Sequence, residues 1–129
     1  MKHVAFLLCV ASIAACSASP NTMRVSSKSV TSDPREVFNA KNVLASKTVR
    51  PHEASFTGFQ AFALGNGDRV YCGQMDATLP TGARTGQIPF YVRTDGVTVK
   101  ALHYKPESAE FASRKCTEVN KGSIKISPH

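Results

Sequence analysis

Residues 69–86 read Arg-Val-Tyr-Cys-Gly-Gln-Met-Asp-Ala-Thr-Leu-Pro-Thr-Gly-Ala-Arg-Thr-Gly. The segment opens with residues of high β propensity, carries Cys72, and continues into a loop that contains Pro80, Gly82 and Gly86. Proline and glycine in such a loop supply the backbone conformations that turns need. We therefore expect a strand that ends in a turn-rich loop, with the rest of the chain paired with it or packed on it.

Two hairpins are expected around this segment. Residues 55–64 are rich in aromatic side chains, and the tight-turn sequence Gly-Asn-Gly-Asp separates them from the strand that begins at Arg69. Apolar and polar residues alternate again over residues 88–93 and, after an Asp-Gly turn, over residues 97–101. Pro89 predicts a free strand edge close to it, because proline cannot donate a backbone hydrogen bond.

A helix is expected on either side of the hairpins. Asp33-Pro34 begins the first helix, because aspartate caps a helix N-terminus and proline fits its first turn, and the apolar spacing extends to about Ser46. Lys105-Pro106-Glu107 begins the second helix, whose inward stripe contains Cys116. The sequence thus predicts an α+β domain, a four-stranded antiparallel meander with an N-terminal and a C-terminal helix packed on one face of a curled sheet.

Residues 1–15 have the features of an export signal. A short basic start precedes an apolar run that is too short to span a membrane and suits the core of a signal peptide. Ile13-Ala14-Ala15-Cys16 then resembles the lipobox of bacterial lipoproteins, in which the cysteine receives acyl chains. That resemblance implies a membrane anchor on Cys16, and Ser17 implies sorting to the outer membrane. The alternative is ordinary cleavage near Ala18, which would release a periplasmic protein.

The remaining chain is expected to consist of a tether, a folded domain and a C-terminal tail. Residues 16–31 are dominated by serine and threonine, cannot bury enough apolar surface to offset their ordering entropy, and are predicted to form a flexible tether. The α+β domain is expected over residues 32–121. Residues 122–129 are expected to form a C-terminal tail, with a short strand through Ile124 and Ile126 as the alternative.

The chain has four cysteines. With Cys9 inside the signal and Cys16 lipidated, Cys72 and Cys116 remain as a pair in an exported domain, where an oxidising compartment favours a disulfide. This bond closes a loop of about 45 residues, which the chain-entropy model values at ~4 kcal/mol. Two buried free thiols are the alternative.

The formal net charge is +7, and it falls to +6 once Lys2 is removed with the signal. The basic residues are scattered along the chain, and no basic run or aromatic platform interleaved with lysines occurs. This pattern speaks against nucleic-acid binding. The excess charge favours a mild attraction to anionic lipid or to a cell-wall polymer.

Residues 51–56 read Pro-His-Glu-Ala-Ser-Phe and residues 70–77 read Val-Tyr-Cys-Gly-Gln-Met-Asp-Ala, followed by Gly82, Gly86 and Phe90. These positions resemble a family of small exported proteins common in alphaproteobacteria, whose pattern contains a Val-Cys-Gly-x-Val-Asn-Ala motif. The resemblance covers roughly a third of the chain. It implies a hairpin that a disulfide ties to the C-terminal segment, and it implies no catalytic residue.

The chain departs from the family pattern at three positions. Asp76 stands where the family has asparagine, Ala83 where it has glycine, and Arg84 where it has tyrosine. If the glycine and tyrosine replaced by Ala83 and Arg84 form a ligand site in the family, the resemblance does not carry that site over to this chain.

The sequence does not assemble a catalytic constellation. His103 is the one histidine in an expected strand, and the cysteines suit a disulfide better than nucleophilic catalysis. Turns account for Asp68 and Asp95, a backbone cap accounts for Asp76, and the loop from Gly82 to Gly86 lacks the lysine and helix of a phosphate site. We therefore expect no enzyme, no cofactor and no metal site. Four aromatic residues are expected to take part in core and sheet packing: Tyr71, Phe90, Tyr91 and Tyr104.

The expected function is that of a lipid-anchored cell-envelope protein in the outer membrane, facing the periplasm or the surface, with a non-enzymatic binding or structural role. Its partner would be another envelope protein, such as a part of a secretion apparatus, or a cell-wall component. Exposed loops on a rigid scaffold commonly carry recognition, and the predicted contact is one such loop: Leu79, Pro80, Thr81, Gly82, Ala83, Arg84, Thr85 and Gly86. The alternative is a periplasmic inhibitor that inserts this loop into a hydrolase such as lysozyme.

Overall fold

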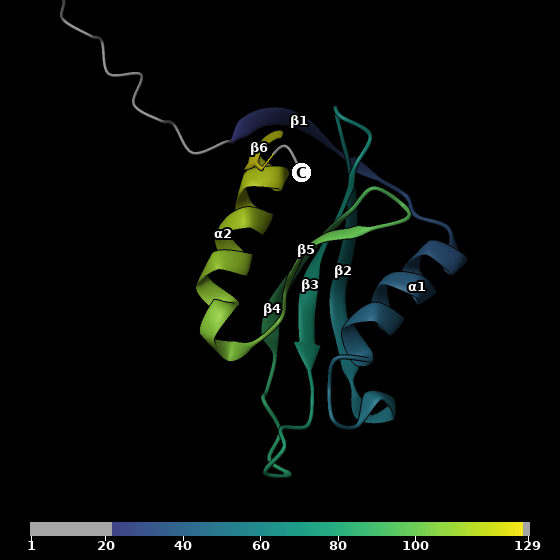
Figure 1. Ribbon diagram of the computed structural model, residues 1–129, viewed down its shortest axis with the longest axis vertical. Helices are drawn as coiled ribbons and strands as arrows, with labels where there is room; N and C mark the ends of the chain where they lie inside the picture. Colours follow the sequence, from purple (N-terminus) through teal and green to yellow (C-terminus); the bar gives the residue numbers. More distant parts are fainter. Residues whose placement is uncertain (1–21, 128–129) are drawn as a thin grey trace, which may run out of the picture.

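The computed structural model describes residues 22–127 (Figure 1). This part of the chain forms a six-stranded antiparallel sheet in the order β5-β4-β3-β2-β1-β6. Its strands are β1 (Met23–Val30), β2 (Ser55–Leu64), β3 (Arg69–Asp76), β4 (Ile88–Thr94), β5 (Val99–His103) and β6 (Ser123–Ile126). Its helices are α1 (Pro34–Ala45) and α2 (Ala109–Asn120), with short 3-10 turns at Pro51–Glu53 and Pro106–Ser108.

The predicted signal peptide, the lipobox with Cys16 and the start of the predicted tether lie outside the described residues. None of the helices between residues 22 and 127 is long and apolar enough to cross a membrane.

The sheet has two strands more than the predicted four-stranded meander. β1 lies in the predicted tether of residues 16–31, and β6 lies in the predicted tail of residues 122–129. The first half of β1 pairs with β6 and its second half pairs with β2, so backbone hydrogen bonds hold a strand that has few apolar side chains. Polar groups of β1 also bond to the end of α2 and the turn after it. The N–H of Ser27 donates to Gly122 O (2.9 Å), and the Ser27 hydroxyl donates to Val119 O (2.7 Å).

The two helices cover opposite faces of the sheet, so the prediction that both pack on one face is wrong (Figure 1). The core on the α2 side contains Phe62, Leu64, Val70, Cys72, Tyr91, Ala112, Val119, Ile124 and Ile126. The core on the α1 side contains Ala40, Leu44, Ala61, Tyr71, Met75, Ala77, Phe90 and Val92. β3 and β4 contribute to both cores, because both alternating sets of their side chains are apolar.

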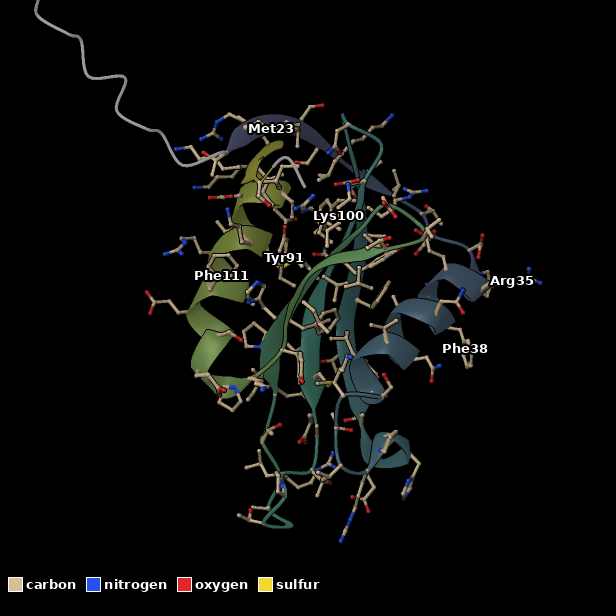
Figure 2. All side chains as sticks on the ribbon, viewed as in Figure 1. Met23, Arg35, Phe38, Tyr91, Lys100 and Phe111 are labelled. Atoms are coloured by element: carbon tan, nitrogen blue, oxygen red, sulfur yellow. A yellow bond between two sulfur atoms is a disulfide. The ribbon has the colours of Figure 1, made fainter. Side chains whose placement is uncertain are left out.

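The helices begin where the sequence predicts. Asp33 caps α1 by accepting a hydrogen bond from the backbone N–H of Glu36 at 2.8 Å, and Pro34 occupies the first turn. The predicted second helix opens with the 3-10 turn Pro106–Ser108 and becomes α-helical at Ala109. Figure 2 shows Phe38 on the outer side of α1, directed away from the sheet, where it is 66% exposed.

The predicted disulfide between Cys72 and Cys116 is confirmed, which excludes two free thiols. The bond joins β3 to α2 across a sequence separation of 44 residues. The Phe90 ring and Thr57 O lie close to the backbone at Gly73, the residue after Cys72. A Cβ atom at this position would lie 2.9 Å from the Phe90 ring and 3.0 Å from Thr57 O, so the strand needs glycine there.

The first strand of the second hairpin forms as predicted, whereas its second strand begins later than predicted. The turn at Asp95 is longer than expected, because the Asp95 carboxylate accepts hydrogen bonds from the N–H groups of Val97 and Thr98. β5 therefore starts at Val99, and Val97 is 95% exposed instead of belonging to the apolar face. β5 ends at His103, which pairs with Tyr91 of β4. No residue of β5 therefore pairs with Pro89, and β4 has the predicted free edge on this side.

A buried ion cluster links the β2–β3 turn to β4 and β5. Asp68 accepts hydrogen bonds from Arg93 Nη1 at 2.7 Å and from Lys100 Nζ at 3.0 Å. Asp68 and Arg93 are each 2% exposed. Burial disfavours the charged carboxylate, but the hydrogen bonds from Lys100, Arg93 and Asn66 outweigh that cost, and the pKa of Asp68 lies below its usual value. Asp68 thus has a structural role beyond the turn to which its sequence position assigns it.

Substituting Asp68→Asn is expected to lower the free energy of unfolding by about 3 kcal/mol, because it removes the carboxylate that neutralises Arg93 and Lys100 in a buried position. The folded-state pKa of Asp68 is depressed, so its stabilisation is present at neutral pH and is lost as the pH falls below roughly 4. Urea unfolding at pH 7 and at pH 3 measures both effects. Glu107→Gln, which removes an exposed carboxylate outside the ion cluster, is the control, and an equal loss in both variants would contradict the expectation.

Candidate functional site

The predicted contact loop connects β3 to β4 and projects from the end of the sheet (Figure 1). Its base is closed by an isolated bridge between Thr78 and Arg84. Inside it, the N–H of Leu79 donates to Ala83 O and the N–H of Gly82 donates to Leu79 O, each at 2.8 Å. Gly82 has φ +89, a conformation that glycine adopts without strain. The loop is therefore a compact turn whose tip is exposed.

Arg84 fixes this loop to the body of the domain. Its Nη1 donates to Glu53 O and to Thr78 Oγ1, each at 2.9 Å, and its Nη2 donates to Asp76 O at 3.3 Å. Its Nε also lies 3.3 Å from Asp76 Oδ1 in an ion pair. The planar guanidinium suits several partners at once, and here all of them lie at the base of the loop. Arg84 thus braces the predicted contact loop, and Asp76 is an ion-pair partner where the sequence predicts a backbone cap.

A second hydrogen bond ties the same base to the 3-10 turn before β2. Thr78 Oγ1 donates to Glu53 Oε2 at 2.6 Å. This hydrogen bond is the main reason that the pKa of Glu53 lies below its usual value, and the nearby charges of Arg50, His52 and Arg84 act in the same direction. Loop residues and the Pro51–Glu53 turn therefore form one connected unit.

A pocket of about 340 Å³ lies beside the loop. Three segments far apart in the sequence line it: the chain after α1, the end of β3 with the contact loop, and the chain after β5. Its lining residues are Lys47, Thr48, Val49, Met75, Ala77, Thr78, Leu79, Pro80, Thr85, Tyr104, Lys105, Pro106 and Glu107. Met75 and Ala77 are buried, whereas Val49 is 53% exposed. The pocket offers an apolar interior with charged groups among its lining residues.

The structure brings part of the predicted site into this pocket. Leu79, Pro80 and Thr85 line it, whereas residues 81–84 and 86 do not. Tyr104, expected in core packing, is half-buried at the pocket wall, while the other three aromatic residues of that prediction are buried. The walls from residues 47–49 and 104–107 are absent from the predicted site, because no local pattern connects these segments to the loop.

Tyr71 and His103 take part in packing. The Tyr71 hydroxyl donates to Glu36 Oε1 at 2.6 Å, and burial together with that carboxylate raises the pKa of Tyr71. The His103 ring lies 4.4 Å from the Phe111 ring, centroid to centroid, and burial lowers the pKa of His103. Among residues 22–127, no group of three or more histidine, cysteine, aspartate or glutamate side chains is placed to hold a metal ion.

The chain matches no protein-family model, no curated protein and no solved structure. The resemblance to the alphaproteobacterial family therefore stays a prediction.

Substituting Arg84→Ala is expected to loosen the contact loop, because it removes three hydrogen bonds and the ion pair to Asp76. Charged hydrogen bonds contribute about 1.5 kcal/mol or more each, so amide exchange at Leu79 and Thr85 should accelerate at least roughly tenfold. Arg84→Lys should exchange more slowly than Arg84→Ala, since lysine keeps the positive charge but lacks the planar set of donors of the guanidinium. Hydrogen exchange followed by NMR measures the effect.

The matched control for this measurement is Lys105→Ala, which removes the same charge from an exposed position beside the pocket. Equal acceleration in Lys105→Ala and Arg84→Ala would show that charge alone, and not the brace, controls the loop.

Proposed function

We propose that this chain is a non-enzymatic lipoprotein of the cell envelope, anchored through acyl chains on Cys16, whose domain binds another protein. The sequence Ile13-Ala14-Ala15-Cys16 behind an apolar signal supports the anchor. Each buried methylene contributes about 0.8 kcal/mol, so several chains on one cysteine hold a protein on a bilayer where a single chain exchanges. Ser17 favours the outer membrane as the destination.

The observation that carries the binding role is a braced loop beside an apolar pocket. A loop held by Arg84 loses little conformational entropy when a partner binds, so more of the contact energy appears as affinity. The pocket suits an apolar side chain, and Lys47 and Lys105 among its lining residues suit an acidic neighbour of that side chain. A protein segment carries both features, which favours a protein partner over a cell-wall polymer.

Inhibition of a hydrolase, for example lysozyme, is the second candidate. The observation that favours it is that the contact loop projects from the end of the sheet and is tied down at its base (Figure 1). A projecting, pre-ordered loop fits a concave active site at low entropic cost. In this case the tip at residues 81–83 would enter the enzyme.

The anchor is tested by metabolic labelling with a radioactive or clickable fatty acid in a bacterial host. Wild type is expected to take up label and to fractionate with membranes, whereas Cys16→Ala is expected to lose both the label and the membrane fraction. Cys9→Ala, which changes a cysteine inside the signal, is the control and should still be labelled. Absence of label in wild type would contradict the anchor.

The contact site is tested by comparing two exposed valines. Val49→Asp places a charge in the pocket, whereas Val97→Asp places the same charge in the β4–β5 turn, and both positions are exposed, at 53% and 95%. Burying a valine contributes about 1.5–3 kcal/mol, so Val49→Asp should weaken binding roughly 10- to 100-fold while Val97→Asp leaves it unchanged. Crosslinking in intact envelopes, followed by affinity measurement with the purified partner, gives the comparison.

The identity of the captured protein separates the two candidates. A structural envelope protein that distinguishes the two variants supports the binding role. A hydrolase that wild type and Val49→Asp both inhibit favours the second candidate, because the loop tip at residues 81–83, and not the pocket, would then make the contact. Equal capture of the partner by Val49→Asp and Val97→Asp would show that the partner does not contact the pocket.

A further inference from the structure

The outer face of β1 and β6 carries a patch of positive charge. Arg24 and Lys125 are direct partners across the antiparallel pair, so their side chains leave the same face. Lys28 shares that face, because it lies four residues after Arg24 in the same strand. The intervening Val25 packs on the core under α2. We name Arg24, Lys28 and Lys125, all of them exposed, the basic strand surface.

These charges are not neutralised within the domain. Like charges directly opposite each other on a sheet destabilise it, and Arg24 and Lys125 form such a pair. Between residues 22 and 127, none of the three side chains of the basic strand surface takes part in an ion pair, whereas Lys115 pairs with Glu118 and Arg93 with Asp68. Lys121, in the turn between α2 and β6, adds a further exposed cation at this end. The domain thus retains an electrostatic cost that a polyanion outside it would relieve.

The position of this surface relative to Cys16 suggests which polyanion that is. β1 begins at Met23, seven residues after Cys16, and an extended chain spans at most ~3.6 Å per residue, or roughly 25 Å in total. Met23 lies with β1 and β6 at one end of the long axis, and the β3–β4 loop lies at the other end (Figures 1 and 2). A lipid on Cys16 would therefore hold the basic strand surface, and not the contact loop, near the bilayer.

We infer that the basic strand surface docks on an anionic phospholipid bilayer. The inference rests on the proposed anchor for its geometry and adds an orientation to it. Anionic headgroups neutralise Arg24, Lys28 and Lys125, and the domain stands on its β1–β6 end. The contact loop and its pocket then point away from the membrane, where a partner reaches them.

The test uses the chain from residue 16 onward with Cys16→Ser, so that no acyl chain is attached and every described element is present. Sedimentation with vesicles of 3:1 phosphatidylcholine and phosphatidylglycerol is compared with vesicles of phosphatidylcholine alone, at low and at physiological ionic strength. We expect binding to the anionic vesicles only, weakened by salt. Each basic residue near an anionic surface contributes about fivefold in affinity, so Arg24→Gln/Lys28→Gln/Lys125→Gln should lose on the order of 100-fold.

The matched control is Arg35→Gln/Lys47→Gln/Lys105→Gln, which removes the same charge from exposed positions outside β1 and β6. An equal loss in both triple variants would overturn the inference, because net charge alone would then explain binding. Binding to neither vesicle, with sedimentation on purified peptidoglycan instead, would overturn it in favour of a cell-wall polymer. The assay contains no acyl chain and no protein partner, so its failure is distinguishable from failure of the anchor or of the contact site.

Discussion

The disulfide between Cys72 and Cys116 is the constraint on which the arrangement of the sheet depends. It joins β3, in the interior of the sheet, to the inward side of α2. With α2 held there, the chain reverses at Gly122 and places β6 beside β1. Ser27 of β1 donates hydrogen bonds to Gly122 O in that turn and to Val119 O before it. A covalent bond at the centre thereby sets the outer edge of the sheet, including the surface that carries Arg24 and Lys125.

Much of the fold could be predicted from the sequence because the signals are local. Asp33-Pro34 marks a helix start through capping chemistry, and the glycine-rich turn after Leu64 marks a hairpin. The disulfide follows from the predicted export and lipid anchor, because these leave one cysteine pair in an oxidising compartment, with one intramolecular pairing. Each of these inferences needs only neighbouring residues or a count, and each agrees with the structure.

The rest depends on distant parts of the chain. β1 is polar, and its order comes from hydrogen bonds to strands more than thirty residues away, which no composition argument captures. β3 and β4 are apolar on both sides, so their alternation cannot say which helix covers which face. The sequence predicts the contact loop as a turn. The hydrogen bond from Arg84 to Glu53 and the pocket wall at Tyr104 form only when three distant segments meet.

The pairing of β1 with β6 joins the first strand of the described chain to the last. The first half of β1 can therefore pair with β6 only after the chain has been made as far as Ile126, whereas its second half pairs with the earlier strand β2, and such long-range pairing slows folding. If the chain is exported, as proposed above, this delay is an advantage, because the chain crosses a membrane before it folds. The order of the strands would keep it loose enough for translocation and would let the sheet close only on the far side.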